Sequence, residues 1–79
     1  MKFVYFVTKG AADPTLASLP LHMAANGSLE VGHEVAVVFA GDGAEITLGD
    51  NAQTLEGVGV PPVRDLLAKL KAGGATVFV

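Results

Sequence analysis

Three segments of the chain consist almost entirely of β-branched, aromatic and other apolar residues. They are residues 2–8 (KFVYFVT), 33–40 (HEVAVVFA) and 76–79 (TVFV). Near-continuous apolar runs of this length are typical of strands buried on both faces of a parallel sheet. Helical patterns separate the segments, so the sequence predicts the element order β-α-β-α-α-β. We expect one α/β domain over residues 1–79, arranged as a three-layer α/β/α sandwich. Strand orders 2-1-3 and 3-2-1 both agree with right-handed crossovers.

The first helix is predicted to begin at Asp13, an N-cap residue that is followed by Pro14. Apolar residues then recur at the helical spacing, at Leu16, Leu19 and Met23. Pro20 lies inside this stretch and predicts either a kink or a later start. The helix can end at Asn26-Gly27 or run on to Gly32, and we expect the longer helix.

Two further helices are predicted between the second and third strands. Asp42 and Glu45 have the spacing of a capping box, which predicts a short helix over residues 43–48. After a loop, Pro61-Pro62 opens a longer helix that ends at Gly73-Gly74. Its apolar positions are Val63, Leu66, Leu67 and Leu70. On its polar side, the spacing of Asp65 and Lys69 predicts an i, i+4 ion pair.

The composition narrows the class of protein. Of 79 residues, 51% are apolar and 16% are charged, which excludes a disordered chain. The absence of Cys excludes a disulfide scaffold and a cysteine-based metal site. A net charge of −3 argues against a nucleic-acid partner. No apolar run approaches the ~20 residues of a membrane-spanning helix, so we expect no membrane partner and a cytoplasmic location.

The strands lack the features that protect the edges of a sheet. A three-stranded sheet has two edges, and edge strands normally carry charge, proline or bulges. Here the only charged strand residues are Lys2 and Glu34, both at strand starts. We therefore expect further chain or a partner subunit to cover part of this domain.

The residues that follow the first two strands carry the candidate binding chemistry. In open parallel sheets, ligands bind beyond the carboxyl ends of the strands. Thr8 offers a hydroxyl there, Lys9 offers a cation, and the helix that begins near Asp13 offers backbone N–H groups. This combination suits a small anionic ligand. We call the candidate site the strand-end rim, and it comprises Thr8, Lys9, Gly10, Gly41, Asp42 and Gly43.

Simpler interpretations compete at these positions. Lys9 can be read as a solvated lysine in a surface loop. The three-residue spacing between Asp42 and Glu45 explains Asp42 as a helix cap. Gly41-x-Gly43 lacks the third glycine of a dinucleotide fingerprint and follows the second strand rather than the first. We therefore expect no cofactor.

The remaining candidate chemistry is sparse. His22 and His33 are the only histidines, and neither has further ligands at a recognisable spacing, so we expect no metal site. No Ser/His/Asp arrangement and no nucleophile elbow is present. The sequence therefore predicts no catalytic residue within residues 1–79.

Three longer segments together resemble the DsrE/DsrF-like family of sulfur-relay and related small α/β proteins. They are KFVYFVTKG at 2–10, LEVGHEVAVVFAGDGAEI at 29–46 and GVGVPPVRDLLAKLKAGGATVFV at 57–79. The resemblance implies a longer α/β/α domain and a homo-oligomer, a trimer or a hexamer. It also implies a cysteine directly after the third strand that passes on sulfur as a persulfide, with a sulfur-carrier protein as a possible partner.

The sequence departs from the family pattern at that cysteine. The position falls just past Val79, and the strand-end rim would surround its thiol. We therefore expect a cytoplasmic, homo-oligomeric subunit for sulfur transfer that lacks its nucleophile within residues 1–79. The alternatives are a non-catalytic interaction subunit and a binder of small anions. We further expect a longer domain, with either a truncation or a UGA codon for selenocysteine after Val79, which the nucleotide sequence tests.

Overall fold

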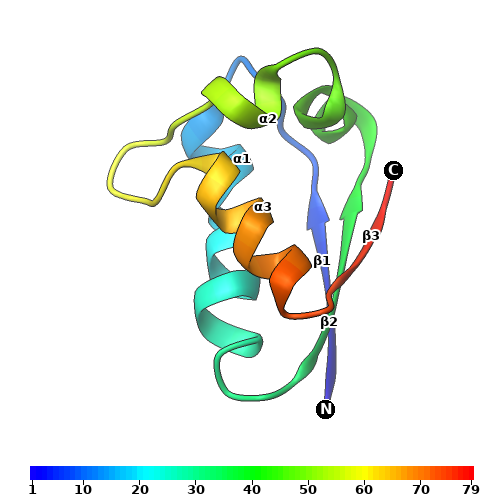
Figure 1. The fold of residues 1–79 in the computed structure, drawn as a ribbon. Helices are drawn as coiled ribbons and strands as arrows, with labels where there is room; N and C mark the ends of the chain where they lie inside the picture. The colour runs from blue at the N-terminus through cyan, green and yellow to red at the C-terminus, as the bar shows by residue number, and fades with distance from the viewer.

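The computed structural model describes residues 1–79, and helices alternate with strands along the chain (Figure 1). The elements are β1 (Lys2–Val7), α1 (Pro14–Met23), η1 (Ala24–Ser28), β2 (Glu34–Phe39), η2 (Gly41–Thr47), α2 (Asn51–Thr54), α3 (Val63–Ala72) and β3 (Thr76–Phe78). The predicted α/β class, with a parallel sheet and helices between the strands, is confirmed.

The sheet has three parallel strands in the order β1-β2-β3, which settles the two orders that the sequence leaves open. Its register aligns Val4 with Ala36 and Thr76, and Phe6 with Val38 and Phe78. Strand β2 therefore lies in the centre, and β1 and β3 form the two edges. No reversal of strand order occurs among these three strands.

Helices α1, η1 and α3 lie together on one face of the sheet (Figure 1). Both crossovers step in the same direction across the sheet, and right-handed crossovers of that kind put their helices on the same face. The core lies between these helices and the sheet, and its buried members are Val7, Ala17, Leu21, Ala24, Ala25, Val35, Val37, Phe39, Ile46, Val63, Leu66 and Leu70.

The second helical layer of the expected three-layer sandwich is not formed by residues 1–79. On the face turned away from the helices, Val4 is 51% exposed, Phe6 is 59% exposed and Phe78 is 55% exposed. The near-continuous apolar runs predict burial on both faces, and the strand order explains why the helices between the strands cover only one. We call the other face the open face.

The start of α1 agrees with the sequence, but its apolar stripe lies on the opposite side from the core. The backbone N–H of Leu16 donates to Asp13 Oδ1 at 3.1 Å, so Asp13 is the N-cap. Pro20 lies within the helix and does not delay its start. Small and branched side chains of α1 pack against the sheet, whereas the residues whose spacing predicts the helix are exposed: Leu16, Leu19 and Met23.

Helix α1 continues directly into the π-helix η1, which confirms the longer helix. The N–H of Leu29 donates to the carbonyl of Ala24, five residues back, at 3.0 Å. The helix thus passes Asn26-Gly27 but ends at Ser28, earlier than the expected stop at Gly32. A turn over residues 29–32 follows, and Gly32 closes it with a φ of 86°, which glycine adopts readily. Within η1, the Ser28 hydroxyl lies 2.6 Å from the Tyr5 hydroxyl of β1, which links this helix to the edge strand.

Two local predictions in the second half of the chain are wrong. Helix η2 is preceded by Ala40 and has no side-chain cap, so Asp42 and Glu45 do not form a capping box. Lys69 does not pair with Asp65, because α3 packs beside η1 and brings the Glu30 carboxylate to 2.7 Å from Lys69 Nζ. The bounds of α3 confirm its prediction from the Pro-Pro start, the apolar spacing and the Gly-Gly end.

Candidate functional site

The strand-end rim is assembled by the pairing of β1 with β2. Because the strands are parallel neighbours, the segments Thr8–Gly10 and Gly41–Gly43 leave the sheet at the same edge. The N–H of Ala40 donates to the carbonyl of Val7 at 3.0 Å, which extends the ladder to the start of both loops. The structure therefore brings all six predicted rim residues to one end of the sheet.

Two glycines allow the loops of the rim to touch. A Cβ atom on Gly43 would overlap the carbonyl of Val7, and a Cβ atom on Gly10 would overlap the Asp42 carbonyl and the Glu45 carboxylate. Both glycines are buried, whereas Thr8, Lys9, Gly41 and Asp42 are exposed. Gly10 and Gly43 thus shape the rim, and the exposed residues are the ones that can meet a ligand.

Glu45 contacts the rim, and sequence reasoning did not identify this role. Its Oε1 accepts a hydrogen bond from the N–H of Ala11 at 3.2 Å and so connects η2 to the loop after β1. The Glu45 spacing to Asp42 was a misleading signal, because it suggested a local cap rather than a contact 34 residues away. No local sequence pattern predicts a contact between residues 34 positions apart in the chain.

The charges near the rim do not form a cationic site. Asp13 caps α1, because its carboxylate accepts a hydrogen bond from the Leu16 N–H. The Asp13 side chain therefore already occupies the N-terminus of this helix. Lys9 is the cation of the rim, and the carboxylates of Asp42 and Glu45 lie on the neighbouring loop. An anion at the rim therefore meets one lysine among several acidic groups, which weakens the case for a tightly bound free anion.

The carboxyl end of β3 reaches the same end of the sheet. Val38 is aligned with Phe78, so Val79 lies level with Phe39, two residues before Gly41. Adjacent strands lie ~4.8 Å apart. A side chain placed directly after β3 therefore lies one strand away from the β2 loop of the rim and two strands away from Lys9.

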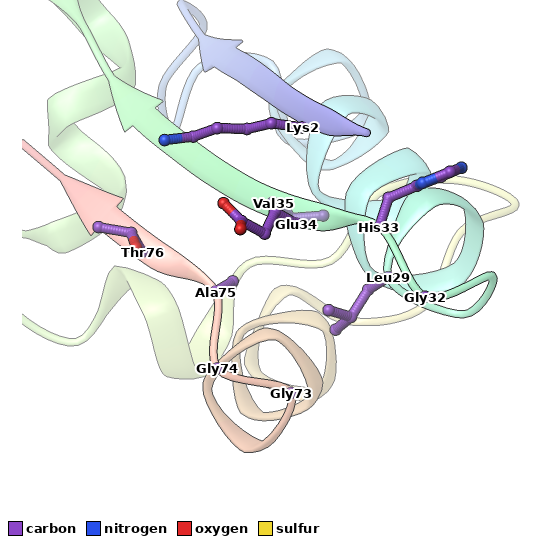
Figure 2. A pocket seen from close by; sticks show the side chains of 10 residues that line it. All are labelled: Lys2, Leu29, Gly32, His33, Glu34, Val35, Gly73, Gly74, Ala75 and Thr76. Atoms are coloured by element: carbon purple, nitrogen blue, oxygen red, sulfur yellow. The ribbon is translucent and has the colours of Figure 1, made fainter.

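The two pockets of the molecule lie at the opposite, amino end of the strands. One, of about 380 Å³, is lined by Lys2, Leu29, Gly32, His33, Glu34, Val35, Gly73, Gly74, Ala75 and Thr76 (Figure 2). The other, of about 460 Å³, is lined by Phe3, Tyr5, Met23, Gly27, Ser28, Val31 and His33. Neither pocket is lined by a rim residue, and sequence reasoning identified neither pocket.

The first pocket has little catalytic character. Figure 2 shows Lys2, Glu34 and Thr76 each projecting from a different strand beside it. Lys2 and Glu34 contribute one positive and one negative charge, and neither forms a salt bridge. His33 borders both pockets, and its ring lies 5.1 Å from the ring of Phe3, so it packs against the edge strand. No three His, Asp or Glu side chains lie close enough together to hold a metal ion.

One carboxyl group has a clearly shifted pKa, and it belongs neither to the rim nor to the lining of either pocket. The hydrogen bond from Lys69, with the attraction of the same ammonium group, lowers the pKa of Glu30 below its ordinary value. Lys69 also donates to Asn26 Oδ1, so this cluster ties α3 to the end of η1. Its role is structural, since no pocket lies at it.

Comparison with known proteins identifies the family. None of the helices is long and apolar enough to cross a membrane. No curated protein and no solved structure matches the chain. The model of the DsrE/DsrF-like family matches residues 1–79. The parallel α/β fold agrees with that match, and the chain belongs to the DsrE/DsrF-like family.

Proposed function

We propose that this chain is a sulfur-transfer subunit in which the strand-end rim surrounds a thiol that carries sulfur as a persulfide. The observation that carries the proposal is the convergence of the β1 loop, the β2 loop and the end of β3 at one end of the sheet. Membership of the DsrE/DsrF-like family supports it. Residues 1–79 contain no cysteine, so the thiol is supplied from outside them.

The chemistry would need a thiolate. The thiolate attacks the outer sulfur of a donor persulfide, a new S–S bond forms, and the donor cysteine leaves as its own thiolate. Lys9 would favour the anionic form of the thiol and of the product persulfide. Thr8 would offer a hydroxyl donor to the same sulfur. The proposal includes a cytoplasmic location, since reducing compartments keep such thiols free.

The test places a thiol at the end of β3. The chain as it stands should take up no sulfane sulfur from a persulfide donor. The variant Val79→Cys should gain the mass of one sulfur atom, and Lys9→Ala should raise the pKa of its thiol by about 0.3 unit, as expected for one charge ~10 Å away in water. The matched control is Val31→Cys, at an exposed position beside the amino ends of the strands. Loading of the cysteine-free chain, or an equal effect of Lys9→Ala on both thiols, contradicts the proposal.

The assembly part of the proposal rests on α1. Members of the family form oligomers, and Leu16, Leu19 and Met23 make an exposed apolar stripe along one side of this helix. We propose that copies of the chain meet through this stripe as a trimer or a hexamer, with a sulfur-carrier protein as a further partner. The variant Leu19→Glu should lower the native mass, whereas Val58→Glu, at an exposed apolar position on a loop, should not. A monomeric parent chain contradicts this part.

The second candidate function follows from the same stripe. If the chain assembles through α1 and Val79→Cys gains no reactivity over Val31→Cys, a non-catalytic interaction subunit is the better description. Native mass and thiol reactivity thus separate the two candidates, because assembly alone supports both and thiol activation supports only the first.

A further inference from the structure

A chain of side-chain hydrogen bonds joins α1 and η1 to α3. His22 and Asn26 lie one turn apart on the same side of the helix, and Asn26 Nδ2 lies 2.9 Å from His22 Nδ1. Asn26 Oδ1 accepts a hydrogen bond from Lys69 Nζ of α3, and the same ammonium group lies 2.7 Å from Glu30 Oε1. We call these four residues the polar bridge.

The lysine fixes which way the Asn26 amide points. An ammonium group can only donate hydrogen bonds, so the amide must present its oxygen to Lys69. The NH₂ group of the same amide then faces His22, and it too can only donate. His22 Nδ1 must therefore accept, which requires a neutral ring that carries its single proton on Nε2. The polar bridge thus selects one tautomer of His22.

Protonation of His22 removes this hydrogen bond. A protonated imidazole carries an N–H group at both ring nitrogens, so two donors would face each other between His22 and Asn26. Turning the amide round does not restore the bridge, because its NH₂ group would then face the Lys69 ammonium. The protonated ring also adds a positive charge to a cluster that already holds Lys69. Either arrangement therefore loses one hydrogen bond of the bridge.

No other charged group takes the place of Asn26 beside His22. The further charged or titratable side chains on the strands, at their starts and on α3 are Lys2, His33, Glu34, Arg64, Asp65 and Lys71. None of them forms a hydrogen bond or an ion pair with His22, whose side chain bonds to Asn26 alone. The carboxylate of the bridge, Glu30, is already paired with Lys69. A protonated His22 thus gains no acceptor from the surrounding elements.

We infer that the polar bridge is a pH-sensitive contact, which holds η1 against α3 while His22 is neutral and loosens when His22 gains a proton. Histidine is the side chain whose charge ordinarily changes between about pH 5 and 8. Glu30 stays charged across that range, because Lys69 lowers the pKa of its carboxyl group. The loosened segment is the π-helix, which is also bonded to the edge strand through Ser28. This inference does not depend on the sulfur chemistry or the assembly proposed above.

Nuclear magnetic resonance of the isotope-labelled parent chain gives the tautomer directly. At about pH 8, His22 should carry its proton on Nε2 and none on Nδ1, and the signals of the Asn26 NH₂ group should shift as His22 gains its second proton. His33 is the internal control, since its ring packs against Phe3 and forms no side-chain hydrogen bond. A proton on His22 Nδ1 at about pH 8, or Asn26 signals that do not follow the titration of His22, overturns the inference.

Removing the imidazole should remove the pH dependence. The folded-to-unfolded ratio of the parent chain, from urea unfolding, should fall about three- to tenfold between about pH 8 and 5.5, as expected for the loss of one hydrogen bond. His22→Gln should lose most of this change, because a glutamine oxygen can accept from Asn26 at any pH. The matched control His33→Gln should keep it. Equal behaviour of the two variants contradicts the inference.

A carboxylate in the middle of the bridge should reverse the direction of the change. Asp at position 26 can accept hydrogen bonds from both a protonated His22 and Lys69, so the folded-to-unfolded ratio of Asn26→Asp should rise, about threefold, as His22 gains its proton. The control Asn51→Asp makes the same substitution on α2, outside the bridge, and should keep the direction of the parent chain. A fall for Asn26→Asp as large as that of the parent overturns the inference. Circular dichroism checks that each variant is folded, and the tautomer measurement on the parent chain decides if one is not.

Discussion

Glu45 Oε1 accepts a hydrogen bond from the N–H of Ala11 at 3.2 Å, across 34 residues of sequence. This bond joins η2 to the loop that follows β1, and it is the direct side-chain link between the two halves of the strand-end rim. The loops also approach closely at Gly10, beside the Asp42 carbonyl and the Glu45 carboxylate, and at Gly43, beside the Val7 carbonyl. The rim therefore depends on one carboxylate and two glycines.

Removing that carboxylate should loosen the loop after β1. Glu45→Ala should lower the free energy of unfolding by about 0.5–1 kcal/mol, because one solvent-exposed hydrogen bond is lost. Hydrogen exchange at the Ala11 amide should become faster. The matched control Glu45→Gln keeps the accepting oxygen and should retain most of the protection. Unchanged exchange at Ala11 in Glu45→Ala would show that the bond does not hold the rim together.

Gly43 and Gly27 should respond to alanine in opposite ways. A Cβ atom at Gly43 overlaps the Val7 carbonyl, so Gly43→Ala should destabilise the fold by about 1–3 kcal/mol. Gly27 lies within η1, and nothing lies within 4 Å of the place where its Cβ would be. Gly27→Ala should therefore stabilise the helix by about 0.5–1 kcal/mol. Urea denaturation measures both, and equal effects of the two substitutions would contradict the close approach at Gly43.

Local patterns in the sequence predicted the elements well, and contacts between distant elements account for the failures. The strands and α3 followed from apolar runs and spacing, and the Asp13 cap followed from residue type. The pairing of Lys69 with Glu30 could not be foreseen, because it depends on α3 packing beside η1, 39 residues away. The spacing of Asp65 and Lys69 describes only the helix in isolation.

The layer arrangement shows the same limit. The apolar stripe Leu16, Leu19 and Met23 predicted a helix correctly, but smaller residues such as Ala17 pack on the sheet. Which side of a helix faces the sheet depends on how closely the backbone approaches it, and small side chains permit that approach. The open face depends on strand order, which the sequence left open between two solutions. The six rim residues came together because β1 and β2 are neighbours in both orders.

The pair of Glu30 and Lys69 should make stability depend on pH in the acid range. Lys69 lowers the folded-state pKa of Glu30, so the pair stabilises the fold above the ordinary glutamate pKa. This contribution is lost as the pH falls through the lowered pKa of the folded state. Thermal unfolding at a series of pH values should show a smaller acid-side loss for Glu30→Gln than for the parent chain. The control Glu56→Gln changes a carboxylate that has no salt bridge and should keep the parent profile.

The hydroxyl groups of Tyr5 and Ser28 should act as a coupled pair. They lie 2.6 Å apart, Ser28 is buried, and the bond ties edge strand β1 to η1. Tyr5→Phe should cost about 1 kcal/mol of stability, and Ser28→Ala a similar amount, because each leaves the other hydroxyl without its partner. If the bond is the source of both effects, the double variant should cost less than the sum by about 0.5–1.5 kcal/mol. Strict additivity in urea denaturation would show that the two substitutions act through packing alone, and that the edge strand is held to η1 by its apolar contacts.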